Sequence, residues 1–423
     1  MEAALLECGS HAPAFGGRSH ASPAVCPKPR LGQTKRKHGL RTPQLLRNGT
    51  REKVARVRTG FFLLLLLASV PAVADSGARG NPAAQLLTGK SASEHWEFTA
   101  RFDSGHFLFV EFLITNIGIG EQNAAAIGHL VTPDGQTRRF INGRRKGRWT
   151  LSPDRLRITV GASTLDLHAP TYQLQVNKQN VRVDLRFSPK GAAVWSDTFV
   201  PAGYFFDLLA AAVPVDGTLW VKGMSAPLPV HGTLAATHSW MNEAGNSLML
   251  RRLEFFTLQE NLPLYGVDFT TPSGTRVRWV VLKQQGEKLY ESGTFDLALD
   301  GQTSAPGDQG YPLPATVRLK NSELDGQFQL DRLLVSDDPF SNLPRVFRFL
   351  VETALNLHPR SLRASSPFAV SLQPARSATS GQAQAFSQIR GTGVTAATFL
   401  NPLPTSQSTA ATEVLMSSDS HNW

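Results

Sequence analysis

Cysteine is nearly absent from this chain of 423 residues, since Cys8 and Cys26 are the only two. Everything after Cys26 therefore has no disulfide or thiolate chemistry available. Excess positive charge is also missing from most of the chain. The formal net charge is +10, but residues 1–60 hold twelve Lys and Arg against three acidic residues. The rest is close to neutral, so the basic balance gives no indication of nucleic-acid binding.

Three further signals are missing. No long amphipathic helical pattern precedes residue 340, which argues against a dinucleotide-binding βα fold. The Gly-x-Gly at Gly118 and Gly120 lacks the third glycine of a phosphate-binding loop. The histidines are not spaced as metal ligands, so we expect neither a metal nor a cofactor.

One short apolar run is present, at Phe61–Ala68. A transmembrane helix needs about 20 apolar residues, and this run is shorter. Arg56 and Arg58 precede it, and Ala72-Val73-Ala74 follows. This pattern predicts a secretory signal peptide over 54–74, cleaved after Ala74, and hence a periplasmic or secreted protein. An uncleaved membrane anchor is the alternative.

The segments around the signal peptide have no hydrophobic period. Residues 1–53 are predicted to be a disordered basic leader, or to precede the true start of the protein. Residues 75–91 are predicted to be a linker, and 373–423, rich in Ser, Thr, Ala and Gln, a disordered tail.

The middle of the chain has the alternation typical of strands. In Val181–Phe187 the apolar residues alternate with Arg182, Asp184 and Arg186. Such runs recur about every ten residues with turn residues between them, which favours antiparallel barrels. We predict one barrel over 92–230 and a second over 231–372. Apolar residues at helical spacing in Leu343–Leu357 predict a helix that packs across a barrel.

The stretch Pro214–Trp240 is predicted to join the two barrels. Asp216-Gly217 is a turn dipeptide. The two Gly-Thr-Leu runs, at Gly217 and Gly232, suggest the last strand of one barrel followed by the first strand of the next. We therefore expect the boundary near Val230–Gly232.

A basic cluster lies at Arg138–Arg148. We interpret it as a solvated hairpin tip. Contact with a membrane surface or an anionic ligand is the alternative.

Three stretches carry a resemblance to a known family: Trp96-Glu97-Phe98, Val215–Trp240 and Tyr265–Gly274 (YGVDFTTPSG). Over roughly Glu94–Val335 the chain resembles the survival-factor-like proteins and the related carotenoid 1,2-hydratases, or hydroxyneurosporene synthases. The resemblance implies an all-β fold of two lipocalin-like (calycin) antiparallel β-barrels in tandem. The short helix predicted at Leu343–Leu357 would follow the strands of the second barrel.

The resemblance also implies candidate catalytic residues. His238 matches the histidine of the hydratases, Trp240 the aromatic residue beside it, and Asp268 the downstream aspartate, with Tyr265 nearby. Thr237 stands where the hydratases have an acid. We expect His238, Trp240, Tyr265 and Asp268 to gather around one cavity.

Three functions fit these expectations. The leading one is binding of a small hydrophobic ligand, a lipid or isoprenoid, because an eight-strand-scale barrel has room for one. Its lining would be aromatic: Trp96, Phe98, Phe109, Trp240 and Tyr265. The second is hydration of a polyene, with Asp268 as the proton donor and His238 as a relay. The third is a scaffold with filled barrels. Thr237 at the acid position favours binding over catalysis.

Overall fold

The computed structural model describes residues 80–117, 120–190, 192–194, 203–284, 287–303, 310–341, 348–349, 352–353, 356–373 and 386–403. The predicted leader, signal peptide and cleavage site lie outside these residues. Within them, no helix is both long enough and apolar enough to cross a membrane.

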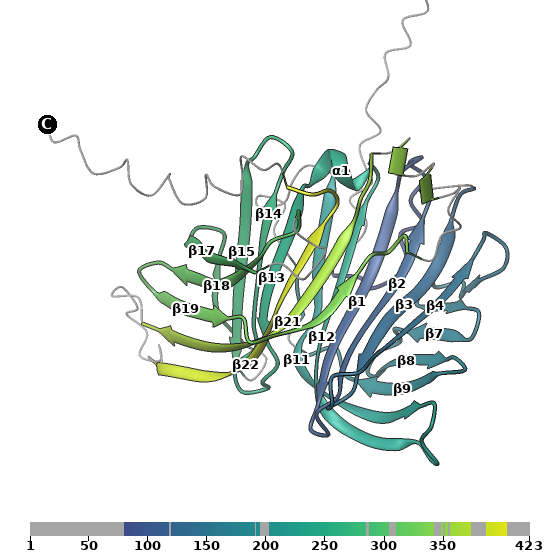
Figure 1. Cartoon of the computed structure of the whole chain (residues 1–423), viewed down its shortest axis with the longest axis horizontal. Helices are drawn as coiled ribbons and strands as arrows, with labels where there is room; N and C mark the ends of the chain where they lie inside the picture. Colours follow the sequence, from purple (N-terminus) through teal and green to yellow (C-terminus); the bar gives the residue numbers. More distant parts are fainter. Residues whose placement is uncertain are drawn as a thin grey trace, which may run out of the picture. The chain divides into compact units, whose positions relative to one another are not determined.

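The first of two antiparallel sheets (Figure 1) runs in the order β4-β3-β2-β1-β12-β11-β9-β8-β7-β6-β5, and β10 also pairs with β11. Its strands are β1 (Ser93–Phe102), β2 (Phe107–Thr115), β3 (Asn123–Val131), β4 (Thr137–Arg144), β5 (Thr150–Leu151), β6 (Arg157–Val160), β7 (Ser163–Asp166), β8 (Tyr172–Asn177), β9 (Val181–Phe187), β10 (Ala193–Val194), β11 (Tyr204–Val221) and β12 (Leu228–Met241).

The second sheet runs in the order β16-β15-β14-β13-β22-β21-β19-β18-β17, and β20 also pairs with β21. The short helix α1 (Gly245–Leu248) precedes it. Its strands are β13 (Arg251–Thr257), β14 (Leu264–Thr270), β15 (Arg276–Gln284), β16 (Glu287–Ser292), β17 (Asp296–Thr303), β18 (Leu313–Lys320), β19 (Leu324–Gln329), β20 (Arg332–Asp337), β21 (Arg360–Leu372) and β22 (Phe386–Phe399).

Both sheets curl into barrels, which confirms the predicted all-β, two-barrel class. In the first, Asn142 of β4 donates to Ser163 of β7 over 2.6 Å and so links two ends of the sheet. In the second, Asn321 donates to the hydroxyl of Tyr290 on β16. Each barrel has its own apolar interior, and a third apolar cluster draws residues from both sheets.

This third cluster lies at the junction, the interface where the two sheets pack together. It explains why β2 is apolar on both faces. Leu108 and Val110 point into the first barrel, while Phe107 and Phe109 belong to the junction.

The predicted boundary between the barrels is wrong. Strand β12 pairs with β1 and β11, so it completes the first barrel and does not begin the second. The predicted turn at Asp216-Gly217 is wrong too. Both residues lie within β11, and the chain turns after Val221, where Gly223 has φ +108°. Gly217 instead allows close approach, since a Cβ there would lie 2.0 Å from the Asp184 carbonyl oxygen.

Part of the predicted disordered tail is ordered. Residues 386–399 form β22, which pairs with both β13 and β21. The small and polar residues of β22 can form a strand because β13 and β21 flank it on both sides. The backbone N–H and C=O groups of β22 therefore find hydrogen-bond partners. The rest of the predicted tail, residues 374–385 and those beyond residue 403, lies outside the described residues.

Two other segments also differ from expectation. Residues 80–87, part of the predicted linker, form a strap over one end of the first barrel, where Ala83 and Ala84 are buried. In the predicted helix, Arg348, Phe349, Glu352 and Thr353 are helical, and most of the rest is not described. Phe349 was expected to pack on a barrel, yet it is 65% exposed.

Candidate functional site

The junction contains a buried polar cluster within its apolar surroundings. Three strands from both sheets supply its charged members, which are Glu97 of β1, Arg252 and Glu254 of β13, and Arg363 of β21. The side chains of Glu97 and Arg363 are 11% and 3% exposed. Strand alternation places these groups here: in β1 the residues on either side of Glu97, Trp96 and Phe98, point into the first barrel.

Arg252 connects the two carboxylates. Its Nη2 donates to Glu97, and its Nε lies 3.1 Å from Glu254 Oε2. Its Nη1 donates to the hydroxyl of Tyr204 over 3.0 Å. On the other side of Glu254, the hydroxyl of Tyr265 donates to the carboxylate. A single guanidinium therefore bridges the two sheets.

Arg363 completes the cluster from the second barrel. Its Nη2 lies 3.5 Å from Glu97 Oε1. Its Cζ lies 3.2 Å from the centre of the Phe109 ring, a cation–π contact. Phe109, one of the predicted ligand-binding residues, thus lies beside the polar cluster.

The two carboxylates differ in acidity. Burial raises the pKa of Glu254 above its ordinary value, even though Arg252 opposes the shift. Burial acts in the same direction on Glu97, but the positive charges of Arg252 and Arg363 outweigh it, so the pKa of Glu97 is lowered. Burial, followed by the charge of Glu254, holds the pKa of Tyr265 well above its usual range. Carboxyl groups whose pKa values are pushed apart are typical of an acid and base pair.

A cavity of about 10 Å³ lies within this cluster. Thr99, Thr237 and Ala396 line it together with Glu97, Glu254, Tyr265 and Arg363. A space of this size is about that of one water molecule.

A larger groove of about 500 Å³ lies at the edge of the junction, between β3, β4 and β20. Asp337 of β20 pairs there with His129 Nε2 at 3.2 Å and Arg139 Nε at 2.8 Å. Phe109 of β2 lies between the groove and the polar cluster. It is paired with His129 of β3, which lines the groove, and with Thr99 of β1, which lines the small cavity.

A second buried polar group lies inside the first barrel. His238 Nε2 is 2.8 Å from Glu94 Oε1, and both side chains are almost fully buried. The His238 ring stacks on Trp96 at a centroid distance of 4.7 Å and lies 4.7 Å from the ring of Trp240. Among the described residues, His238 Nδ1 has no hydrogen-bond partner.

The strap holds the other side of Glu94. The backbone N–H groups of Gln85 and Leu86 donate to its carboxylate over 2.8 to 3.4 Å. Trp96 Nε1 donates to the Pro82 carbonyl over 3.0 Å. Glu94 thus joins His238 to the strap, which covers this group from outside the barrel.

Asp268 lies in a third place, inside the second barrel. Its carboxylate is fully buried and contacts three arginines, Arg251 at 3.0 Å, Arg276 at 2.9 Å and Arg278 at 3.2 Å. No other acidic side chain pairs with these arginines in the described part of the chain.

The structure therefore separates the predicted site residues. His238 and Trp240 lie inside the first barrel with Trp96, whose neighbour along the same face is Phe98. The junction contains Phe109 and Tyr265, whereas Asp268 is inside the second barrel. The shared cavity is not formed, because Tyr265 and Asp268 stand three residues apart on β14 and so face opposite sides of the sheet.

The assignment of Thr237 as a lost acid also fails. Thr237 faces the junction, and the carboxylate beside His238 comes from Glu94 on the neighbouring strand. Sequence analysis missed Glu94, Glu97 and Glu254. A signal existed for two of them: Glu94 continues the apolar face of Trp96 and Phe98, and Glu254 lies in the apolar run LEFF.

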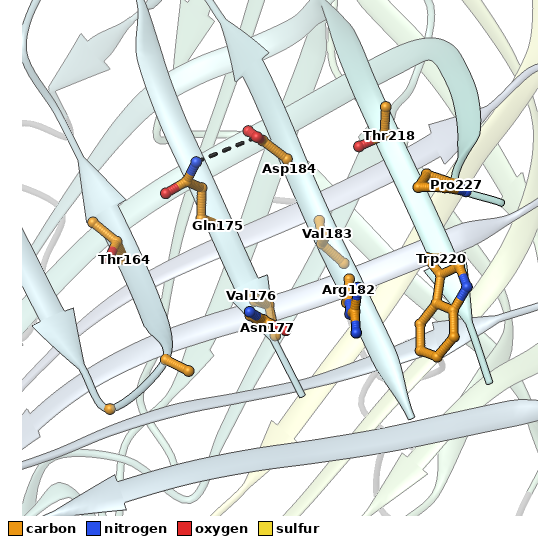
Figure 2. Close-up of a pocket in the computed structure, with 12 residues that line it drawn as sticks. Thr164, Gln175, Val176, Asn177, Arg182, Val183, Asp184, Thr218, Trp220 and Pro227 are labelled. Atoms are coloured by element: carbon orange, nitrogen blue, oxygen red, sulfur yellow. Dashed lines mark hydrogen bonds between the residues drawn. The ribbon is translucent and has the colours of Figure 1, made fainter. Parts of the chain in front are cut away.

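A third opening, a groove of about 410 Å³, lies on the outer face of the first barrel. Figure 2 shows side chains that line it. Its polar side chains already contact one another. Gln175 donates to Asp184 over 3.2 Å, and Arg182 lies over the Trp220 ring at 4.7 Å. The groove has no buried titratable group, so we place the candidate site at the junction.

No family model matches the chain, and no curated protein matches it by sequence. Solved structures do match. NE1406 of Nitrosomonas europaea, a candidate AttH, has a TM-score of 0.54 at 12% identity, covering 74% of this chain and 93% of its own. CghA, solved with Sch210972, has a TM-score of 0.54 at 10% identity, covering 77% and 96%. The chain has the two-barrel fold of these proteins.

Kievitone hydratase of Nectria haematococca is also similar, with a TM-score of 0.49 at 12% identity, covering 76% of this chain and 94% of its own. At these identities the likeness concerns the fold alone. The likeness to NE1406 and CghA agrees with the fold that the family resemblance implied.

Proposed function

We propose that the protein binds a small hydrophobic ligand, lipid-like or isoprenoid-like, at the junction of the two barrels. The observation that carries this proposal is the groove of about 500 Å³ at the edge of the junction, which shares Leu334 and Val335 with the apolar interface around the buried Glu97–Arg252–Glu254 cluster. Binding sites commonly combine an apolar lining with a few convergent polar groups, and often lie between domains. CghA, which shares the fold and was solved with Sch210972, supports a small-molecule role for such a fold.

The ligand enters through the groove at the edge of the junction. Phe109 separates the groove from the cluster, so its ring has to turn aside, and Arg363, which lies over that ring, has to move with it. The aromatic residues of the junction, among them Phe256, Tyr265 and Trp279, then contact the ligand. Burial of apolar ligand surface supplies most of the binding free energy.

The test measures the binding of Nile red, a neutral hydrophobic dye, by its fluorescence. In Ala396→Leu the larger side chain fills the small cavity, and we expect at least fivefold weaker binding. Ala162→Leu, on the exposed outer surface, is the matched control and should bind as the wild type does. Thermal unfolding checks that both variants are folded. No saturable binding by the wild type would contradict the proposal and favour the scaffold alternative.

Hydration of a polyene is a second candidate, and the raised pKa of Glu254 favours it. A protonated Glu254 donates its proton to one alkene carbon, forming the C–H bond. Water adds to the resulting cation, forming the C–O bond. Its released proton passes to the Glu97 carboxylate and from there returns to Glu254 before the next turnover. General acid catalysis of this kind contributes on the order of 10²–10⁴ in rate.

The assay incubates the protein with acyclic carotenoids and measures tertiary alcohols. We expect Glu254→Gln to abolish any turnover, whereas Asp268→Asn, in the second barrel, should retain it if it folds. Turnover lost in Asp268→Asn and kept in Glu254→Gln would return the acid role to Asp268.

We also propose that the protein is exported. The support is the signal-peptide pattern, in which cleavage after Ala74 would leave every described residue in place, since these begin at Gly80. N-terminal sequencing of the protein from the periplasmic fraction should begin near Asp75. Residues before Gly60 in that fraction would argue for an uncleaved leader.

A further inference from the structure

We propose that Arg251, Arg276 and Arg278 form an anion-binding site at one end of the second barrel, for a carboxylate or phosphate group. The three residues lie on β13 and β15, next to the hairpin between β14 and β15. Strand alternation directs them inward, since Leu253 of β13 and Val280 of β15 belong to the interior of the second barrel.

The charges in this cluster do not balance. Three guanidinium groups face a single carboxylate, that of Asp268, which leaves an excess of two positive charges. Buried charges are costly unless they are paired. Burial and the nearby charge of Arg276 hold the pKa of Arg251 below its ordinary value, with Asp268 opposing the shift. A second anion would reduce this repulsion.

The cluster also has donors to spare. Each guanidinium carries five N–H groups. Arg276 uses its Nε and one Nη2 donor on Asp268. Arg278 uses its Nε on Asp268 and one Nη1 donor on the Phe295 carbonyl. Arg251 Nε is buried and has no partner among the described residues.

An incoming anion can reach these donors. The side chains of Arg276 and Arg278 are 30% and 24% exposed, whereas Asp268 is fully buried beneath them. Solvent therefore reaches the side chains of Arg276 and Arg278 but not the carboxylate of Asp268. The planar donor fork of arginine suits carboxylate and phosphate oxygens, which can accept two parallel hydrogen bonds.

The test uses isothermal titration calorimetry at constant ionic strength, with inorganic phosphate in one series and laurate in another. We expect saturable binding of at least one, weakened at least tenfold in Arg276→Gln and in Arg278→Gln. Arg318→Gln is the matched control, because Arg318 is an exposed arginine of the same barrel that pairs with Asp300. If laurate binds and phosphate does not, the ligand class is a carboxylate with an apolar tail. If phosphate binds and laurate does not, the ligand class is a phosphate group.

Asp268→Asn gives an independent signature. Removing the internal carboxylate raises the excess charge, so anion binding should become tighter and the added anion should raise the melting temperature of this variant. Failure of both probes to bind the wild type, or equal weakening in the Arg318→Gln control, would overturn the proposal. The site is separate from the junction, so Nile red binding does not decide it.

Discussion

Glu254 occupies an unusual place for an acidic residue, since its neighbours along β13, Leu253 and Phe255, fill the second barrel. Its own side chain points the other way, into the junction. There Arg252 and Tyr265 are its polar contacts. Removing one partner from such a buried pair typically costs about 3–5 kcal/mol, because a charge is left uncompensated. The cluster is therefore sensitive to any single change.

The first prediction concerns the pH dependence of stability. A carboxyl group with a raised pKa in the folded state binds its proton more tightly there than in the unfolded chain. Its stabilising contribution is full below the unfolded pKa of about 4.3 and is lost as the pH rises through the folded pKa. We expect the free energy of unfolding to fall over this window by about 1.4 kcal/mol for each unit by which the pKa of Glu254 is raised.

Urea unfolding between pH 3 and pH 9 measures this dependence. In Glu254→Gln the decline should disappear. Glu97→Gln is the matched control, because the pKa of Glu97 is lowered. Its contribution is present above the unfolded pKa and is lost as the pH falls through the folded pKa. This variant should therefore be less stable at neutral pH and lose the rise in stability at the acidic end. It should keep a smaller decline at higher pH, because the Glu97 charge helps to raise the pKa of Glu254. An unchanged curve in Glu254→Gln would mean that the carboxyl group does not hold its proton.

At the residue scale, sequence analysis identified side chains but not the faces on which they lie. Tyr265 and Asp268 match one motif, yet strand alternation directs one to the junction and the other into a barrel. The same alternation separates Thr237 from His238. The partner of His238 is Glu94, 144 residues away in the chain, and no local pattern joins the two.

At the element scale, β12 and β22 join the early strands of each sheet to its later ones. Each pairs with the first strand of its own barrel, β1 or β13. The alternation of apolar residues was sufficient to predict most strands and the antiparallel class. It did not assign β12 to the correct barrel, and it missed β22, because these pairings depend on partners far away in the chain. In β22 the pairing on both sides overrides a weak local strand preference.

The second prediction concerns β22. Truncation after residue 373 removes a strand that buries Ala397 and Phe399 completely and pairs with two neighbours. We expect the second barrel to lose its fixed packing, with loss of the near-ultraviolet circular dichroism signal. Truncation after Leu403 keeps β22 and is the control. Retention of the wild-type spectrum by the shorter chain would contradict the assigned role of β22.

At the scale of the whole molecule, the two barrels share an apolar interface. It includes Phe107 and Phe206 of the first sheet and Phe269 and Trp279 of the second, all nearly fully buried. Without the other barrel, this interface would be a large exposed apolar patch, and such patches are rare on soluble monomers. Neither barrel is therefore complete without the other.

The third prediction follows from this shared interface. The fragment 80–249, which contains only the first barrel, should aggregate or bind hydrophobic dye strongly, because its junction face is uncovered. The full chain should unfold in one cooperative transition by calorimetry. Two separate transitions in the full chain, together with a soluble monomeric fragment, would show that the barrels are independent.

The strap has a consequence for the timing of folding. It docks on Glu94, whose other partner, His238, is made 144 residues later. At a synthesis rate of about 5–20 residues per second, about 7–30 seconds pass between these two residues. During that interval Trp96 has no histidine to stack on and β1 has no β12 to pair with. The beginning of the first barrel therefore remains without these partners until β12 has been synthesised.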